Sequence, residues 1–205
     1  MEVFHYHLVT SELRGVEARY IGKLGFHLVA RYGRIGDEHV SIEPGISWEK
    51  LDHDGFTIRL TELECGALNV VVQPGNWRIP RVDHIGLALD EEEFQAVLGR
   101  ATRWDLRVQE HVGRRTFITT DAGYRLEVHP PREWIAELLE GRDKLRLSEL
   151  QLRADEPQAK ARALADILGL EAVGATVLVG ETAVSFVHGG PEGRPELYGE
   201  RFGQS

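Results

Sequence analysis

The segment HIGLALD, residues 84–90, decides the fold of this chain because its design occurs three times in the sequence. It is a short apolar stretch of strand character that ends in a residue favoured just before a helix. The other copies are HYHLVTS at residues 5–11 and ELQLRAD at residues 149–155. The three residues expected to cap a helix are Ser11, Asp90 and Asp155. An internal repeat of this kind indicates that one supersecondary unit is used several times.

A helix-favouring stretch follows each opening and stops at nearly the same distance. The stops lie 20, 21 and 20 residues after His5, His84 and Glu149, and they are Gly25, Asp105 and Gly169. Glycine supplies the left-handed conformation that ends many helices, and aspartate is a tolerable second choice. Further strand-like stretches follow each stop. Each copy therefore reads as a βαβββ unit.

The repeat predicts an α+β fold of βαβββ modules in which two paired modules form a cup and a third is added. Modules one and two occupy residues 1–78 and 79–131, and residues 132–145 form a linker with an amphipathic helix, REWIAELLEGRDKL. Residues 146–205 form a third, degenerate module with PELYGERF as its last strand. One module alone leaves a sheet face and an edge uncovered. The third is therefore expected to be structural and to pack in a homodimer, or to cap an edge of the first pair.

Composition and charge exclude several kinds of partner. A net charge of −9 argues against a nucleic-acid surface, which needs a basic stripe. No stretch approaches the 18 or so apolar residues of a membrane helix, and the N-terminus lacks the features of a signal peptide. The single cysteine, Cys65, allows no internal disulfide and fits a reducing compartment. We therefore expect a cytoplasmic protein whose partners are small molecules or other proteins.

Three stretches give the sequence a likeness to a known family: DHIGLAL at residues 83–89, FITTDAGYRLEVHPP at residues 117–131 and LGFHLVARYG at residues 24–33. In this order they resemble the vicinal oxygen chelate superfamily, which includes glyoxalase I, extradiol ring-cleaving dioxygenases and bleomycin-resistance proteins. The resemblance covers nearly all of residues 3–131 and, more weakly, residues 146–203. It implies a cup whose metal ligands come from the first and fourth strands of each paired unit.

Carried over by position, the resemblance implies that His5, His84 and Glu127 bind one divalent metal ion. By ligand type we expect Fe(II) or Mn(II), with Zn(II) or Ni(II) as alternatives.

The fourth ligand position of the family falls on the stretch NVVVQP. Aligning the two units by their closing prolines places Val71 opposite Glu127, and valine cannot bind a metal. Two histidines and one carboxylate resemble the extradiol dioxygenase arrangement, which leaves coordination sites free. A different strand register would bring Glu62 or Glu64 to the site and restore the four ligands of glyoxalase I.

Strand geometry adds three side chains to the inner face of the cup. Side chains two residues apart face the same side, so His7 accompanies His5, and Arg125 and His129 accompany Glu127. We predict that His7 or His129 transfers a proton during catalysis. We predict that Arg125 binds an anionic group of the substrate.

Two classes of function fit these residues. The first is a metal-dependent enzyme that chelates neighbouring oxygens of a small oxygenated metabolite. Dioxygenase chemistry is the leading subtype, and a glyoxalase-like lyase or isomerase is the next. The second class is a metal-free binding or antibiotic-resistance protein of the same fold, in which the histidines only line a pocket. The three-ligand set favours the enzyme, because a pure binder has no need of such a set at equivalent strand positions.

Overall fold

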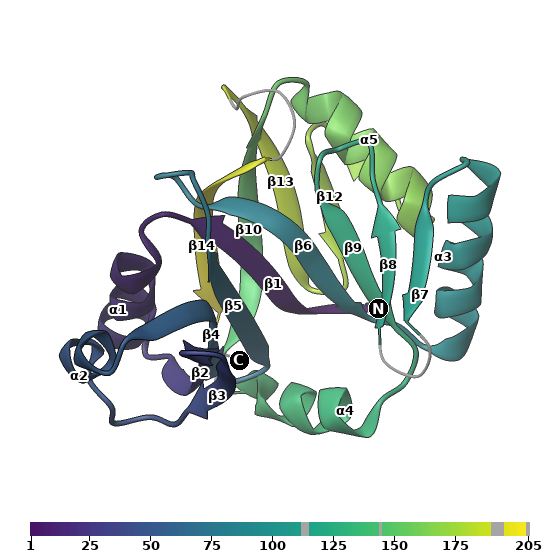
Figure 1. Cartoon of the computed structure of the whole chain (residues 1–205). Coiled ribbons are helices and arrows are strands. Elements are labelled where there is room, and N and C mark those ends of the chain that lie inside the picture. The colour runs from purple at the N-terminus through teal and green to yellow at the C-terminus, as the bar shows by residue number, and fades with distance from the viewer. Residues whose placement is uncertain (112–114, 144, 190–194, 204–205) are drawn as a thin grey trace.

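The computed structural model describes residues 1–111, 115–143, 145–189 and 195–203. Within these ranges three units are built on the predicted βαβββ order, the first with one additional strand and one additional helix, which confirms the α+β fold (Figure 1). The first unit contains β1 (Glu2–Thr10), α1 (Leu13–Leu24), β2 (His27–Ile35), β3 (Glu38–Ile42), α2 (Trp48–His53), β4 (Phe56–Cys65) and β5 (Leu68–Pro74). The second contains β6 (Arg81–Ala88), α3 (Glu91–Arg103), β7 (Val108–His111), β8 (Arg115–Thr119) and β9 (Arg125–His129). After α4 (Glu133–Leu139) and a 3-10 turn (Glu140–Asp143) come β10 (Arg146–Ala154), α5 (Pro157–Leu168), β11 (Ala172–Val173), β12 (Thr176–Val179), β13 (Thr182–His188) and β14 (Glu196–Gly203).

In every unit the first and last strands pair in parallel, as β1 with β5, β6 with β9 and β10 with β13. The helix of the unit makes the crossover that a parallel pair requires. The first two units join where β1 pairs antiparallel with β6. The strands of these two units therefore run in the order β3-β2-β4-β5-β1-β6-β9-β8-β7. The first strand of each unit, β1 and β6, lies in the middle.

Two β-bulges interrupt the pairing of β1 with β6. The extra residue is Phe4 on β1 and Asp83 on β6. A bulge redirects side chains, so that sequence neighbours can face the same side of a sheet. Asp83 and His84 both reach the inner face in this way, and a carboxylate oxygen of Asp83 lies 2.9 Å from Nδ1 of His84. Phe4 similarly joins His5 in lining the cup.

The third unit differs from the sequence prediction at its end. Its last strand is β13, and the PELYGERF segment forms β14 on the other side of β10. β14 pairs antiparallel with β10 as β6 does with β1, with bulges at the corresponding positions, Ser148 and Tyr198. The third unit also packs on the second, because Arg100 of α3 donates to the carbonyls of Ile167 and Leu168 at the end of α5. The homodimer stays a prediction, which light scattering can test.

The predicted helix ends are mostly confirmed. Gly25 and Gly169 end α1 and α5 in the left-handed conformation, with φ of 76° and 72°. Asp90 caps α3 in a reciprocal capping box. Ser11 and Asp155 were the wrong caps: α1 and α5 begin one residue later, after residues that make no side-chain cap bond.

The segment between β2 and β4, to which the sequence assigned no element, forms β3 and α2. The predicted linker helix is α4, which buries Ile135. Its Trp134 is half exposed and packs edge-on against the rings of Phe4 and His129, so α4 lies beside the cup. None of the helices in the described ranges is long and apolar enough to cross a membrane.

Candidate metal centre

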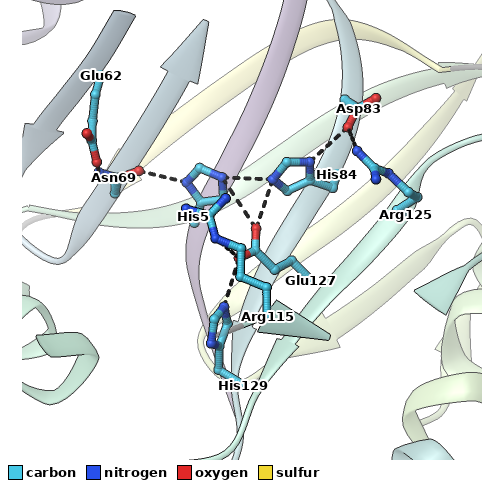
Figure 2. Close-up of polar contacts among 9 residues, drawn as sticks. All are labelled: His5, Glu62, Asn69, Asp83, His84, Arg115, Arg125, Glu127 and His129. Atoms are coloured by element: carbon cyan, nitrogen blue, oxygen red, sulfur yellow. Dashed lines mark hydrogen bonds and ion pairs between the residues drawn. The ribbon is translucent and has the colours of Figure 1, made fainter. Parts of the chain in front are cut away.

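Three side chains from three strands of the paired units converge at one point of the cup (Figure 2). Nε2 of His5 lies 3.1 Å from Nε2 of His84, which lies 2.9 Å from Oε2 of Glu127. The third side of this triangle, from His5 to Glu127, is 4.0 Å. Atoms at these separations lie on a circle with a radius of about 2 Å, which is the length of a bond from zinc to nitrogen or oxygen. The predicted convergence of His5, His84 and Glu127 is therefore present in the structure.

His84 is fixed in one tautomer by its neighbour Asp83. A carboxylate only accepts hydrogen bonds, so Nδ1 of His84 must donate to Asp83 across 2.9 Å. Nε2, on the other side of the ring, can then present a lone pair to the cup. Arg125 holds Asp83 in place by an ion pair with the same carboxylate oxygen.

His5 is fixed in the same tautomer by Asn69. Its Nδ1 lies 2.7 Å from the carbonyl oxygen of the Asn69 side chain, which is 6% exposed. The register of β1 with β5 places Asn69 directly opposite His5. Nε2 of His5 therefore also presents a lone pair.

Glu127 is oriented by two donors on its other oxygen. His129 donates from Nε2 to Oε1 across 2.9 Å, and Nε of Arg115 lies 3.5 Å from that oxygen. Oε2 is left to face the two imidazoles.

The three converging atoms are all hydrogen-bond acceptors when both histidines are neutral. They lie between 2.9 and 4.0 Å apart in a buried place, where unpaired acceptors are costly. A cation among them removes this cost, and two imidazoles with one carboxylate suit several divalent metals. Hydrogen bonds to the outer atoms of ligands are also the usual support of a metal centre. The donor set fits a divalent metal ion.

The electrostatics of the site keep His5 neutral and Glu127 ionised. Burial lowers the pKa of His5 to about 4, and the nearby His84 lowers it too. Burial opposes the charge on Glu127, but the hydrogen bond from His129 and the neighbouring imidazoles of His84 and His5 outweigh it and leave the pKa of Glu127 well below its usual range. Neutral histidine and ionised glutamate are the metal-binding states.

A cavity of about 350 Å³ opens beside the three converging atoms. Its wall combines aromatic, apolar and charged side chains, namely Phe4, His5, His7, Tyr32, Arg59, Leu60, Glu62, Glu64, Asn69, Val71, Arg115, Glu127 and Trp134. This volume suits a small molecule. A larger pocket of about 490 Å³ lies between α4 and the N-terminus, but none of His5, His84 and Glu127 lines it.

His7 and His129, the two candidates for proton transfer, have different surroundings. His7 lines the cavity, and its buried Nε2 has no hydrogen-bond partner among the described residues. Its ring nitrogens also come within 4.8 Å of those of His5 and His84, so three imidazoles form a second possible ligand group. His129 is only 1% exposed, does not line the cavity and holds Glu127. His7 is thus better placed to meet a substrate.

The remaining predicted residues are placed as follows. Arg125 is paired with Asp83 and does not line the cavity, so the cavity's cations are Arg59 and Arg115 instead. Val71 lines the cavity at the position corresponding to Glu127, as predicted from the aligned prolines. Glu62 and Glu64 bind the side-chain nitrogen of Asn69.

Sequence reasoning missed the residues that orient the ligands: Asn69, Asp83 and Arg115. Asn69 could have been found, because parallel register places it opposite His5. Asp83 could not, because its direction depends on a bulge.

Gly86 is predicted to be essential for the position of His5. A Cβ at Gly86 would lie 2.7 Å from Cβ of His5. We expect Gly86→Ala to displace His5, to cost about 1–3 kcal/mol of stability by overpacking and to weaken metal binding. Urea unfolding and metal titration measure both. Gly99→Ala on α3 is the control, since nothing lies within 4 Å of its added Cβ; it should stabilise the helix by roughly 0.5–1 kcal/mol.

Acid is predicted to destabilise the metal-free protein from about pH 6.5 downward. Burial lowers the pKa of His5 to about 4 and that of His7 to about 3, from an ordinary 6.5. Below pH 6.5 the unfolded chain takes up these protons and the folded chain does not, so each histidine costs about 1.4 kcal/mol per pH unit. Urea unfolding in a chelator at pH 7 and pH 5.5 checks this. His7→Gln should reduce the slope, and a slope unchanged by that substitution would contradict the assignment.

Solved structures share this fold at low sequence identity. The Mn(II)-bound glyoxalase from Novosphingobium aromaticivorans gives a TM-score of 0.57 at 12% identity, covering 96% of this chain and 63% of its own. A mutant of 4-hydroxymandelate synthase from Streptomyces coelicolor gives 0.60 at 12% identity, covering 98% and 70%. Homoprotocatechuate 2,3-dioxygenase from Arthrobacter globiformis gives 0.55 at 14% identity, covering 92% and 60%.

This chain thus spans less than two thirds of the length of the glyoxalase and of the homoprotocatechuate dioxygenase. At these identities the likeness establishes the fold and leaves the activity open. No protein-family model and no curated protein sequence matches the chain.

Proposed function

Because this chain has the fold of the vicinal oxygen chelate superfamily, we propose that it is a metal-dependent enzyme acting on a small oxygenated metabolite. Its ligands are His5, His84 and Glu127, and its chemistry is most like that of a dioxygenase with two histidines and one carboxylate. The observation that carries this proposal is the triangle of three acceptor atoms, 2.9–4.0 Å apart, each with its outer partner in place.

Val71 supports the dioxygenase type over a four-ligand centre. It occupies the position that corresponds to Glu127 in the first unit and offers no ligand atom. Oε1 of Glu62 and Oε1 of Glu64 each accept from Asn69, which favours a centre without a carboxylate of β4 as its fourth ligand. A centre with three protein ligands leaves room for two substrate oxygens.

A divalent metal bound here would polarise the oxygens of a chelated substrate and, as Fe(II), would give access to dioxygen chemistry. The protein supplies the remaining functions. His7 can accept a hydrogen bond from a substrate hydroxyl at its unpartnered Nε2, which orients that group. His129 keeps Glu127 aligned, and Phe4 and Trp134 form an aromatic wall. Arg115, at the mouth of the cavity, attracts an anionic substrate group.

Metal titration of the purified protein tests the proposal. We expect one Fe(II) or Mn(II) ion per chain by calorimetry, with catechol as a test chelator binding only to the metal-loaded protein. Oxygen uptake with the Fe(II) form would then distinguish a dioxygenase from a glyoxalase-like lyase or isomerase. His39→Ala, at an exposed position of β3, is the matched control and should bind metal like the wild type.

A metal-free binding or resistance protein is the second candidate, and one observation favours it. His84 lies 2.9 Å from each of two carboxylates, Asp83 and Glu127, so side chains of the protein itself meet both of its ring nitrogens without a metal. In that case neither Fe(II), Mn(II) nor Zn(II) would be taken up, and any ligand would bind equally well in the presence of a chelator.

A further inference from the structure

We propose that Glu62 and Glu64 are positioning residues that act through Asn69 to keep the proton of His5 on Nδ1, so that Nε2 presents its lone pair to the metal. This inference rests on the proposed function. The side-chain nitrogen of Asn69 lies 2.8 Å from Oε1 of Glu62 and 3.0 Å from Oε1 of Glu64. The side-chain oxygen of Asn69 lies 2.7 Å from Nδ1 of His5. Figure 2 shows this chain of contacts from Glu62 to His5.

The two carboxylates determine the orientation of the Asn69 amide. An amide nitrogen has two hydrogens, and here each meets one carboxylate. Rotating the amide by half a turn would point its oxygen at Glu62 and Glu64, which only accept hydrogen bonds. Acceptors would then face acceptors. Two glutamates therefore hold the carbonyl of Asn69 toward His5.

The orientation of Asn69 in turn determines the tautomer of His5. A carbonyl oxygen can only accept, so Nδ1 of His5 carries the proton and Nε2 carries the lone pair. With a rotated amide, Nδ1 would accept and Nε2 would carry the proton. Nε2 of His5 lies 3.1 Å from Nε2 of His84, so a proton there would occupy the space of the metal.

The second unit supports this interpretation because it contains a corresponding chain. Parallel register places Asn69 opposite His5 and Arg125 opposite His84. Arg125 reaches His84 through Asp83, whose charge makes its acceptor role unconditional. Asn69 is neutral and could bond either way. Asn69 therefore needs the two glutamates to make it an acceptor toward His5, whereas Asp83 is an acceptor by its charge alone.

The placement of the glutamates also fits this role. Glu62 and Glu64 are two residues apart on β4 and line the same cavity, so like charges face one side of the strand. Neighbouring like charges are unfavourable unless a donor lies between them. Asn69 is that donor.

Three variants test the inference. Asn69→Ala removes the partner of His5 and should weaken Mn(II) binding about 10–100-fold, the usual effect of losing a group that orients a ligand. In the double variant Glu62→Gln, Glu64→Gln, each amide can donate or accept, so Asn69 is free to rotate; we expect both tautomers and roughly a 10-fold loss. Adding Asn69→Asp to this double variant should restore affinity, because the glutamine amides donate to the aspartate and both aspartate oxygens are acceptors.

The decisive measurement is the tautomer of His5 in the metal-free protein, read from ¹⁵N chemical shifts. We expect Nδ1–H alone in the wild type, a mixture in the double variant and Nδ1–H alone again in the triple variant. The control Glu38→Gln, Glu43→Gln makes the same charge change at exposed positions and should leave tautomer and affinity unchanged. A double variant with a single wild-type tautomer would overturn the inference. Because the tautomer is read without metal, it tests the inference even if the metal titration fails.

Discussion

His84→Ala is expected to abolish useful metal binding while leaving the chain folded. His84 lies 3.1 Å from His5 and 2.9 Å from Glu127, so its nitrogen is the shared corner of the ligand triangle. A four-ligand structural zinc site is worth about 10–16 kcal/mol, or about 2.5–4 kcal/mol per ligand, which corresponds to a loss of about 10²–10³-fold in affinity. Calorimetric titration with Mn(II) measures the loss.

Thermal unfolding gives an independent reading of the same variant. A metal that binds only the folded state raises the melting temperature as its concentration rises. Mn(II) should therefore stabilise the wild type and the His39→Ala control but leave the melting temperature of His84→Ala unchanged. Equal stabilisation of all three proteins would place the metal elsewhere.

Glu17→Ala is expected to cost about 3–5 kcal/mol of stability, because it leaves a buried charge without its partner. Glu17 is 3% exposed and Arg31 is 6% exposed. Arg31 donates to both oxygens of Glu17, from Nε across 2.9 Å and from Nη2 across 2.6 Å. Trp48 and Thr61 donate to the same carboxylate, each across 2.9 Å. These hydrogen bonds join α1 to β2, α2 and β4 of the first unit.

Urea unfolding measures this loss, and two further variants make the result specific. Arg14→Ala breaks the Arg14–Asp52 pair, whose side chains are both 52% exposed, and should cost less than about 1 kcal/mol. Glu17→Ala combined with Arg31→Met should recover much of the loss, because no charge is then left unpaired. If Glu17→Ala lowered the free energy of unfolding no more than Arg14→Ala, water would have to solvate Arg31 in the variant, which would contradict the prediction.

The repeat explains why the arrangement of the site could be predicted from sequence. Equivalent strands of the units carry His5 and His84, and the closing prolines set the register that places Glu127 and Val71 at matching positions. Convergence of the three side chains therefore follows from topology, and the structure shows it. Their role as metal ligands stays a prediction.

Other features could not be predicted from sequence because they depend on contacts that periodicity does not record. The alternation of β9 places Arg125 on the inner face. However, the bulge at Asp83 brings a carboxylate to Arg125, and the two form an ion pair, so Arg125 does not line the cavity. β14 has the pattern expected of the last strand of the unit. However, β13 holds the position parallel to β10, and β14 pairs with the other edge of β10. The helix α2 is only six residues long, too short for a clear period.

The two bulges where β1 meets β6 have a consequence for how this molecule can change. A one-residue slip of a strand turns every side chain to the opposite face, and the bulges at Phe4 and Asp83 fix the register against such a slip. The pairing of β1 with β6 therefore sets the alignment of His5 with His84, and the loops that connect the strands do not. Surface connections can lengthen, shorten or exchange residues without separating His5 from His84. The lining of the cavity can therefore diverge among descendants of this protein while the placement of His5 beside His84 is inherited unchanged.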